Sequence, residues 1–190
     1  MAMRAMPGLC LIRPADANEV PQAWRMHING DGPTAIILTR QNVPVLDATA
    51  ERAPAGLPRG AYTLVDESGD LDLVLIGTGS EVHLCVDARE QLEADGISVR
   101  VVSMPSWELF AEQPDQYRDE VLPPGVPTLA VEAGASLGWD RYADDVIAID
   151  RFGASAPGSV VLAELGYTAE NVVARARALL ALDPPGKKAR

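Results

Sequence analysis

An arginine stands directly after a short apolar run in this sequence. Thr34 to Leu38 has the pattern of a strand, and Thr39, Arg40 and Gln41 follow it. In open α/β sheets, ligands bind in the crevice outside the carboxyl ends of the strands, and a guanidinium can hold an anionic group through two parallel hydrogen bonds. Arg40 is therefore a candidate anion-binding residue. The alternative is a surface ion pair, which is common for an arginine at such a position.

The glycine-rich loop Gly77-Thr78-Gly79-Ser80 is a second candidate for anion binding. It precedes a helical pattern, so the amides at Gly79 and Ser80 could meet a phosphate at the helix N-terminus. The dinucleotide fingerprint is incomplete, because Val82 occupies the place of its third glycine and no acidic residue follows the next strand. The alternative is that these glycines serve a tight turn and close packing.

Other motifs with chemical residue types are not expected to form catalytic or metal sites. Gly30-Asp31-Gly32 copies the first half of a thiamine diphosphate signature, but the second half is absent, so these residues predict a turn. His83 has no partner at metal-ligand spacing except Cys85, which points elsewhere around the helix. Ser155 resembles a nucleophile elbow, but no histidine follows it. We therefore predict no catalytic residue and no metal ligand.

Glu132 follows the apolar run Thr128 to Val131 and precedes the glycines Gly134 and Gly138 and then Trp139. Such a glutamate could line a pocket, or it could accept hydrogen bonds from the backbone amides of the next helix. We favour the second interpretation.

The elements that must position these residues are clearest between residues 72 and 103. Leu73 to Ile76 has the pattern of a strand buried on both faces, and Ile97 to Val102 repeats it. Between them, Ser80 is predicted to cap a helix that Gly96 closes. A crossover of this length makes the two strands parallel. The expected apolar stripe of the helix comprises Val82, Cys85, Val86 and Leu92.

Upstream, Leu9 to Ile12 predicts a strand, and Asp16 with Glu19 resembles a capping box that opens a helix ending near Ile28. Because Pro21 lies just beyond the first turn, the helix could instead start at Asn18 or bend at the proline. We expect a structural role for His27 in this helix. The predicted buried face comprises Val20, Ala23, Trp24 and Ile28.

Residues 47–60 read DATAERAPAGLPRG, which is rich in Ala, Pro and Gly and typical of a linker. We place a domain boundary here, with units at residues 1–47 and 61–183, a linker at 48–60 and a tail at 184–190. Downstream we expect an edge strand over 61–65, short helices over 107–110 and 114–121, strands over 128–131 and 146–149, and a last helix capped by Thr168. The predicted fold is α/β, with three layers and a mostly parallel open sheet covered by helices on both faces.

The composition excludes two classes of partner. The chain has 190 residues, 47% of them hydrophobic, and a formal net charge of −11. Nucleic acids and anionic membranes require a clustered positive field, so we expect neither as a partner. No apolar run is long enough to span a bilayer, and Cys10 and Cys85 stand in separate apolar settings that favour reduced, packed thiols. We therefore predict a cytoplasmic location.

Five segments together resemble the carboxyl-terminal third of the transketolase family. Each motif is weak alone, but their order and spacing match the family over almost the whole chain. The segments are Arg13-Pro-Ala-Asp-Ala-Asn-Glu19, Leu38-Thr-Arg-Gln-Asn42, Gly77-Thr-Gly-Ser-Glu81, Val131-Glu-Ala-Gly134 and Phe152-Gly-Ala-Ser-Ala-Pro-Gly158.

The resemblance implies that residues 1–47 are the end of a pyrimidine-binding domain and that residues 61–183 are a transketolase C-terminal domain. Transketolases transfer a two-carbon ketol unit between sugar phosphates, using thiamine diphosphate with Mg²⁺ or Ca²⁺, and act as homodimers. Arg40 matches the arginine of the family that grips the substrate phosphate. The diphosphate-binding domain and the glutamate that activates the pyrimidine ring are absent, so we expect this chain to bind no cofactor and to be inactive alone.

Two other functions are kept as alternatives. The chain could be a non-catalytic anion-binding or regulatory α/β module that uses the loop Gly77 to Ser80. It could also be the equivalent domain of another thiamine enzyme, such as the β subunit of a 2-oxo acid dehydrogenase or deoxyxylulose phosphate synthase. The segments 38–42 and 152–158 favour transketolase over these enzymes.

Overall fold

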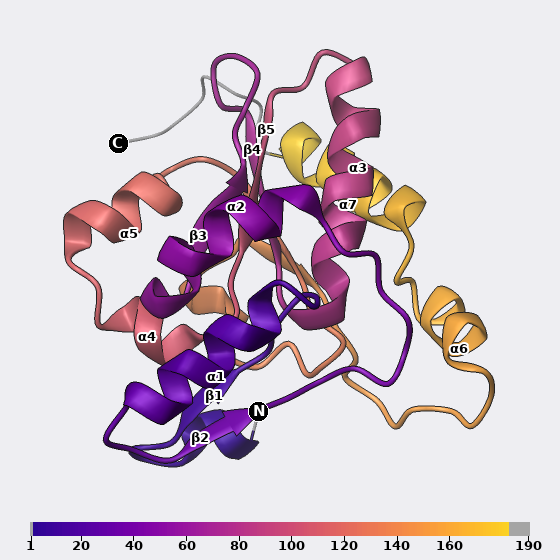
Figure 1. Cartoon of the computed structure of the whole chain (residues 1–190). Coiled ribbons are helices and arrows are strands. Elements are labelled where there is room, and N and C mark those ends of the chain that lie inside the picture. The colour runs from indigo at the N-terminus through magenta and orange to yellow at the C-terminus, as the bar shows by residue number, and fades with distance from the viewer. Residues whose placement is uncertain (1, 183–190) are drawn as a thin grey trace.

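The computed structural model describes residues 2–182, which form two sheets and the helices around them (Figure 1). The smaller sheet pairs β1 (Cys10–Ile12) and β2 (Thr34–Ile36) in parallel. The larger sheet has the strand order β3-β5-β4-β6-β7, and only its edge strand β3 runs antiparallel to its neighbour. The predicted mostly parallel α/β fold is confirmed. The strands of the larger sheet are β3 (Tyr62–Val65), β4 (Leu73–Gly77), β5 (Val99–Ser103), β6 (Thr128–Val131) and β7 (Asp145–Ile147).

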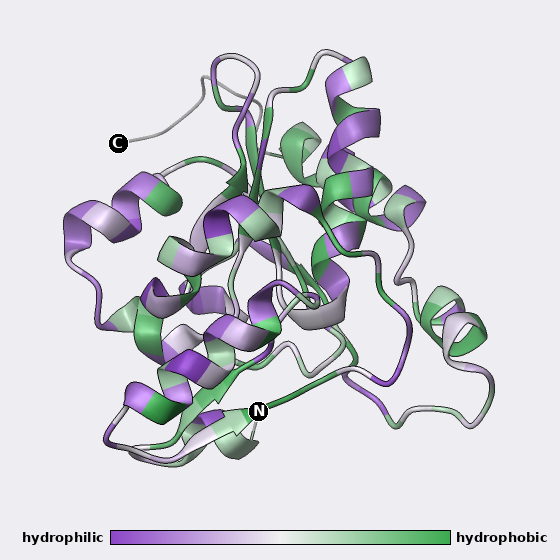
Figure 2. Cartoon of the chain, in the orientation of Figure 1, coloured by the Kyte–Doolittle hydropathy of each residue, from purple (hydrophilic) through white to green (hydrophobic). Residues whose placement is uncertain are grey.

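Helices cover both faces of the larger sheet, as predicted. Because strand side chains alternate between faces, Leu73 and Leu75 of β4 pack into one core, and Val74 and Ile76 pack into the other. The first core includes α2, α3 and α7, and the second includes α4 and α5. Figure 2 shows hydrophobic residues concentrated along the strands between these layers. The helices are α1 (Glu19–Asn29), α2 (Asp47–Gly56), α3 (Val82–Ala94), α4 (Trp107–Ala111), α5 (Asp115–Val121), α6 (Gly158–Glu164) and α7 (Ala169–Leu182).

The predicted strand, helix and parallel strand between residues 72 and 103 are β4, α3 and β5, which pair from Leu73 opposite Val99 to Gly77 opposite Ser103. The predicted helix cap at Ser80 is wrong. Ser80 lies inside a 3₁₀ turn, η3 (Gly79–Glu81), that delays the start of α3 to Val82, and its hydroxyl bonds the Glu81 carboxylate rather than a backbone amide.

The segment predicted as a linker is helical in the structure. Residues 47–56 form α2, and residues 57–59 form a 3₁₀ turn, η2 (Leu57–Arg59). Its small residues permit close packing on β3 rather than chain flexibility. A Cβ added at Gly56 would lie only 2.2 Å from Cγ of Tyr62, and Thr49, Ala53 and Gly56 are buried. Whether a domain boundary falls within 48–60 remains a prediction.

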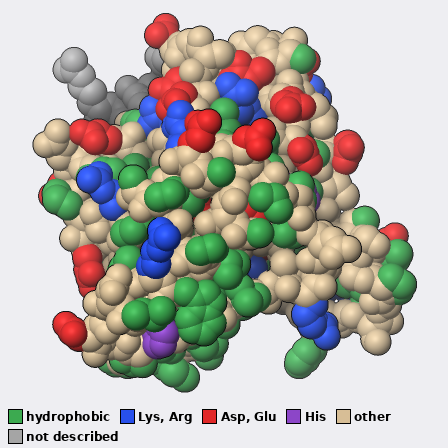
Figure 3. Space-filling view, in the orientation of Figure 1, with side chains coloured by type: hydrophobic (Ala, Val, Ile, Leu, Met, Phe, Trp, Pro, Cys, Tyr) green, Lys and Arg blue, Asp and Glu red, His purple; other side chains and the backbone are tan. Residues whose placement is uncertain are grey.

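The capping box predicted for α1 is present in a shifted form. The Asp16 carboxylate accepts hydrogen bonds from the amides of Asn18 and Glu19, and the Glu19 carboxylate accepts one from the Ala15 amide at 2.7 Å. The helix begins after Asn18, which agrees with the alternative start. The predicted buried face is wrong in part, because Trp24 is 50% exposed and Ile28 is 74% exposed. Among the described residues no element covers that side of α1, and Figure 3 shows hydrophobic side chains gathered beside a histidine over this region.

The later elements agree with the predictions in type and place. The Thr168 hydroxyl caps α7 by accepting a hydrogen bond from the Asn171 amide at 3.2 Å. The short helix α6 was not predicted from the sequence. The predicted end of the second unit at residue 183 and the predicted tail at 184–190 lie outside the described residues. Within residues 2–182, no helix combines the length and hydropathy needed to cross a membrane.

Candidate functional site

Arg40 lines a cavity at the carboxyl ends of strands from both sheets. The cavity has a volume of about 190 Å³ and lies where β2, β4 and β6 end. The cavity is lined by both candidate anion sites that the sequence indicated, which are Arg40 and the pair Gly79 and Ser80. The lining residues are Arg13, Ile37, Leu38, Thr39, Arg40, Gln41, Gly79, Ser80, Glu81, Ala133 and Leu162.

The Arg40 side chain is available to a ligand. It is exposed, and among the ion pairs of residues 2–182 none involves its guanidinium. The alternative interpretation, a surface ion pair, therefore does not hold within the described part of the chain. The neighbouring Thr39 hydroxyl accepts a hydrogen bond from the Gln41 amide at 3.1 Å, which orders the turn that carries Arg40.

The other charged groups beside this cavity neutralise one another. Arg13 donates from Nη1 to Glu132 Oε1 at 2.7 Å and from Nη2 to Glu81 Oε2 at 2.9 Å. Arg4 donates from Nη1 to Glu132 Oε2 at 2.7 Å and stacks 3.9 Å from the ring centroid of Trp107. Two guanidinium groups thus face two carboxylates and add no net charge. An anion in the cavity would therefore meet Arg40 as the uncompensated cation.

The environment favours the ionised forms of Glu132 and Arg13. Burial tends to raise the pKa of Glu132, but the hydrogen bond and charge of Arg4 and the charge of Arg13 outweigh it and hold that pKa below the usual value. Burial tends to lower the pKa of Arg13, but the charges of Glu81 and Glu132 outweigh it and raise that pKa.

The prediction that Glu132 binds backbone amides is wrong. Its carboxylate accepts hydrogen bonds from the side chains of Arg4 and Arg13 and from Trp139 Nε1 at 2.7 Å. Sequence reasoning missed Arg4 and Arg13, because their shared partner Glu132 is more than a hundred residues away along the chain. The signal that could have indicated Arg13 is its place directly after a predicted strand, which is the same argument that selected Arg40.

Two groups at the predicted helix-terminus anion site are already engaged. The Gly79 amide donates to the Arg13 carbonyl at 3.1 Å, and the Ser80 hydroxyl bonds the Glu81 carboxylate. Gly77 supports the packing interpretation, because a Cβ there would lie 2.6 Å from Cα of Val82. An anion site at Gly79 and Ser80 stays a prediction.

A second cavity of about 240 Å³ adjoins the first and shares Gln41, Ser80, Glu81 and Leu162 with it. His83 lines this second cavity, and its Nδ1 lies 2.6 Å from the carbonyl oxygen of Ser80. Among the described residues no cluster of three or more His, Cys, Asp or Glu side chains has the arrangement to hold a metal ion.

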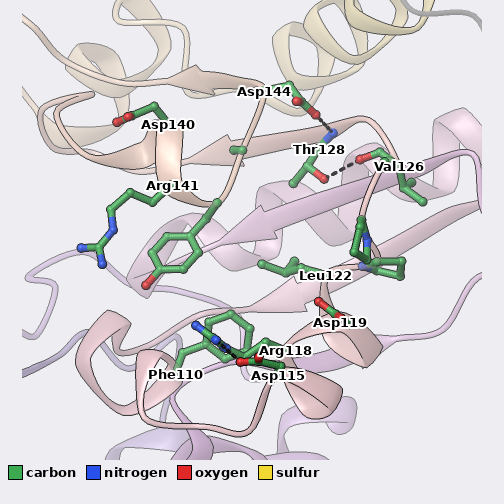
Figure 4. Close-up of a pocket in the computed structure, with 15 residues that line it drawn as sticks. Phe110, Asp115, Arg118, Asp119, Leu122, Val126, Thr128, Asp140, Arg141 and Asp144 are labelled. Atoms are coloured by element: carbon green, nitrogen blue, oxygen red, sulfur yellow. Dashed lines mark hydrogen bonds and ion pairs between the residues drawn. The ribbon is translucent and has the colours of Figure 1, made fainter. Parts of the chain in front are cut away.

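A cavity of about 430 Å³ lies at the opposite end of the strands (Figure 4). It opens where β6 and β7 begin, and Asp144 accepts a hydrogen bond there from the Thr128 amide at 2.9 Å. Its Arg118 pairs with Asp115. Since open α/β sheets bind ligands at the carboxyl ends of their strands, the cavity that contains Arg40 is the better candidate site.

The parallel strands and the cavity at their carboxyl ends define an open α/β protein with a candidate site at the strand ends. Comparison with known proteins gives the family. The model of the transketolase-like C-terminal domain matches residues 60–168, and that of the transketolase pyrimidine-binding domain matches residues 1–45. The chain belongs to the transketolase family.

Known transketolases match the chain closely over a part of their own length. The transketolase of Geobacillus stearothermophilus is 56% identical over 185 residues, which is 94% of this chain and 28% of that protein. The solved transketolase of Leishmania mexicana superimposes with a TM-score of 0.93 and 43% identity, covering 99% of this chain and 28% of its own. A Pichia stipitis transketolase in complex with sedoheptulose 7-phosphate has a TM-score of 0.88 and 38% identity, over 95% of this chain and 26% of its own. The chain thus spans little more than a quarter of the length of these relatives.

Proposed function

We propose that this chain is the carboxyl-terminal part of a transketolase, in which Arg40 binds the phosphate of the sugar-phosphate substrates. The observation that carries the proposal is the position of Arg40, which is exposed and has no ion pair among residues 2–182, in a cavity at the carboxyl ends of the strands. Its neighbours Arg13, Glu81 and Glu132 are mutually compensated. A phosphate dianion would therefore be attracted to the Arg40 guanidinium, whose planar fork suits two phosphate oxygens.

The role of Arg40 in such an enzyme would be to bind and orient. A phosphate group is remote from the carbon atoms that react, and binding energy from a remote group helps to hold the substrate in a productive position. A mutant of a related transketolase, from Pichia stipitis, has been solved in complex with fructose 6-phosphate, which supports a phosphorylated substrate for the complete enzyme.

The family implies thiamine diphosphate in the complete enzyme, where it supplies the carbanion chemistry. The described residues do not fit a site for its diphosphate and metal. Asp31, in the partial signature, is exposed in the turn before β2, and no metal-ligand cluster occurs within residues 2–182. We therefore assign no reaction step to these residues. We expect activity only when the remaining part of the enzyme is present, and we propose that the complete enzyme is a homodimer.

The experiment that tests the role of Arg40 supplies the chain with the rest of the transketolase length and measures ketol transfer by the Arg40→Ala variant. A hydrogen bond to a charged group contributes about 1.5–3 kcal/mol, so KM for a phosphorylated acceptor should rise roughly 10- to 150-fold. KM for an unphosphorylated acceptor should change much less.

The matched control is Arg25→Ala, since Arg25 is exposed on α1 and its bond among the described residues is to Gln22 of the same helix. This control should leave both KM values unchanged. Equal losses for the two acceptors in Arg40→Ala would count against phosphate binding by Arg40.

A further inference from the structure

Arg13 connects the smaller sheet to the carboxyl ends of three strands of the larger one. Its amide donates to the Pro105 carbonyl at 2.8 Å, after β5, and its carbonyl accepts from the Gly79 amide at 3.1 Å, after β4. Its guanidinium reaches Glu81, also after β4, and Glu132, after β6. The Arg13 side chain is only 13% exposed, and those of Glu81 and Glu132 are 3% and 5% exposed.

The path from Arg13 to Arg40 is short. Arg13 follows the last residue of β1, Ile12, whose carbonyl accepts a hydrogen bond from the Ile37 amide at 2.9 Å. Arg40 lies three residues beyond Ile37, and both arginines line the same cavity. The position at which Arg13 is anchored therefore sets the position of the segment 37–41.

We propose that Arg13 is a positioning residue for substrate-phosphate binding: held by Glu81 and Glu132, it fixes the segment that presents Arg40 to the cavity. The inference rests on the function proposed for Arg40. The proposal also gives the larger sheet a part in substrate recognition, because both carboxylates that hold Arg13 follow strands of that sheet.

Arg13 is not itself the phosphate-binding group. Each of its Nη atoms donates to a buried carboxylate, and drawing it toward a ligand would remove a cationic partner from both of these buried groups. The loop around it is also shaped for this side chain. Gly79 has φ +62°, and a Cβ there would lie 3.1 Å from Nη2 of Arg13.

A guanidinium is required for this arrangement, because its planar fork can bond two carboxylates at once, whereas a lysine ammonium presents one compact charge. Arg13→Lys should therefore keep the charge and lose one of the two contacts. The carboxylates retain other donors in that variant, since the Ala133 amide bonds Glu81 and both Arg4 and Trp139 bond Glu132. We accordingly expect Arg13→Lys to fold.

The first test measures amide hydrogen exchange in the 190-residue chain. In Arg13→Lys the Ile37 amide should exchange roughly tenfold faster, as expected when a local opening becomes easier, whereas the amides of β4 keep their protection. Arg25→Lys is the matched control and should change neither. Unchanged exchange at Ile37 in Arg13→Lys would overturn the proposal. Should that variant fail to fold, Glu81→Gln, which retains an acceptor for the Ala133 amide, replaces it with the same expectation.

The second test separates positioning from general stability by ketol-transfer kinetics, with the rest of the enzyme supplied. Arg13→Lys should raise KM for a phosphorylated acceptor roughly tenfold, within the range that small displacements of a binding group produce, and should spare an unphosphorylated acceptor and kcat. In the Arg40→Ala background it should have no further effect, because Arg13 acts through Arg40.

The outcomes distinguish the two proposals. If Arg40→Ala affects both acceptors equally, the function proposed for Arg40 fails, and the kinetic part of this inference fails with it. If Arg40→Ala behaves as expected but the effects of Arg13→Lys and Arg40→Ala multiply, only the positioning role of Arg13 is overturned.

Discussion

Two buried glutamates show how differently the same side chain behaves at the residue scale. Glu19 is fully buried and accepts hydrogen bonds from the Tyr62 and Ser103 hydroxyls at 2.7 and 2.6 Å, and burial raises its pKa. Glu132 is nearly as buried, but the guanidinium groups of Arg4 and Arg13 lower its pKa despite burial. A cationic partner, rather than burial, therefore decides the sign of the shift.

This difference predicts the pH dependence of the free energy of unfolding. The pKa of Glu132 is lower in the folded protein than its usual value of 4.5, so its stabilising contribution is present above that value and is lost as the pH falls through the folded pKa. Glu132→Gln should therefore lower the free energy of unfolding at neutral pH, and its difference from the wild type should shrink below pH 4.5. Urea unfolding of both proteins across this pH range measures the difference in the free energy of unfolding.

The control for this prediction is Glu90→Gln on α3, which is exposed. Its difference from the wild type should be small at every pH. A difference for Glu132→Gln that stayed constant from neutral to acidic pH would contradict the assigned role of the charge pairs.

At the scale of elements, α2 shows why composition misled the prediction of a linker. Ala, Pro and Gly are frequent in flexible linkers, but small residues also let a helix approach a sheet closely. Thr49 bonds the Asp16 carboxylate at 2.6 Å, and Gly56 packs on the ring of Tyr62. The helix is therefore held by contacts with α1 and β3 that lie outside its own sequence.

Gly56→Ala tests this packing. Helix propensity alone would favour alanine by about 1 kcal/mol, but the added Cβ would lie 2.2 Å from Cγ of Tyr62. Overpacking of this kind costs about 1–3 kcal/mol, so we expect a net loss of unfolding free energy in chemical denaturation. Gly153→Ala is the control, because nothing lies within 4 Å of a Cβ there, and it should change stability little. A stabilised Gly56→Ala protein would contradict the observed contact.

At the scale of the whole molecule, the first residues and the larger sheet form one connected structure. Arg4 and Arg13 reach Glu132 across the chain, and the Tyr62 and Ser103 hydroxyls reach Glu19 in the opposite direction. Ala15 also packs into the core that includes α3 and α7. Polar and apolar contacts thus cross between the parts that match the two family models.

We therefore expect the 190-residue chain to unfold in a single transition. Circular dichroism reports the unfolding of all helices. The fluorescence of a Trp24→Phe variant reports the surroundings of Trp107 and Trp139, which lie in the core that includes α4 and α5. The two denaturation curves should coincide. An earlier transition by circular dichroism alone would show that α1 and the smaller sheet unfold separately.

Local sequence patterns were enough to predict the α/β class, the parallel β4-α3-β5 unit and the position of Arg40 directly after a strand. Apolar periodicity, chain length between strands and the position of a residue directly after a strand need no knowledge of distant contacts. The motifs of residues 13–19, 38–42 and 152–158 also indicated the family, which the comparisons confirmed.

Only the tertiary structure decided the helix at residues 47–56, the exposure of Trp24 and Ile28, and the partners of Glu132. Each depends on what another part of the chain places nearby. Arg13 and Glu132 are the clearest case, since they stand 119 residues apart and meet because the two sheets place the ends of β1 and β6 side by side. A charge pair at that separation leaves no periodic signal in the sequence, and its geometry is set by the packing of the two sheets.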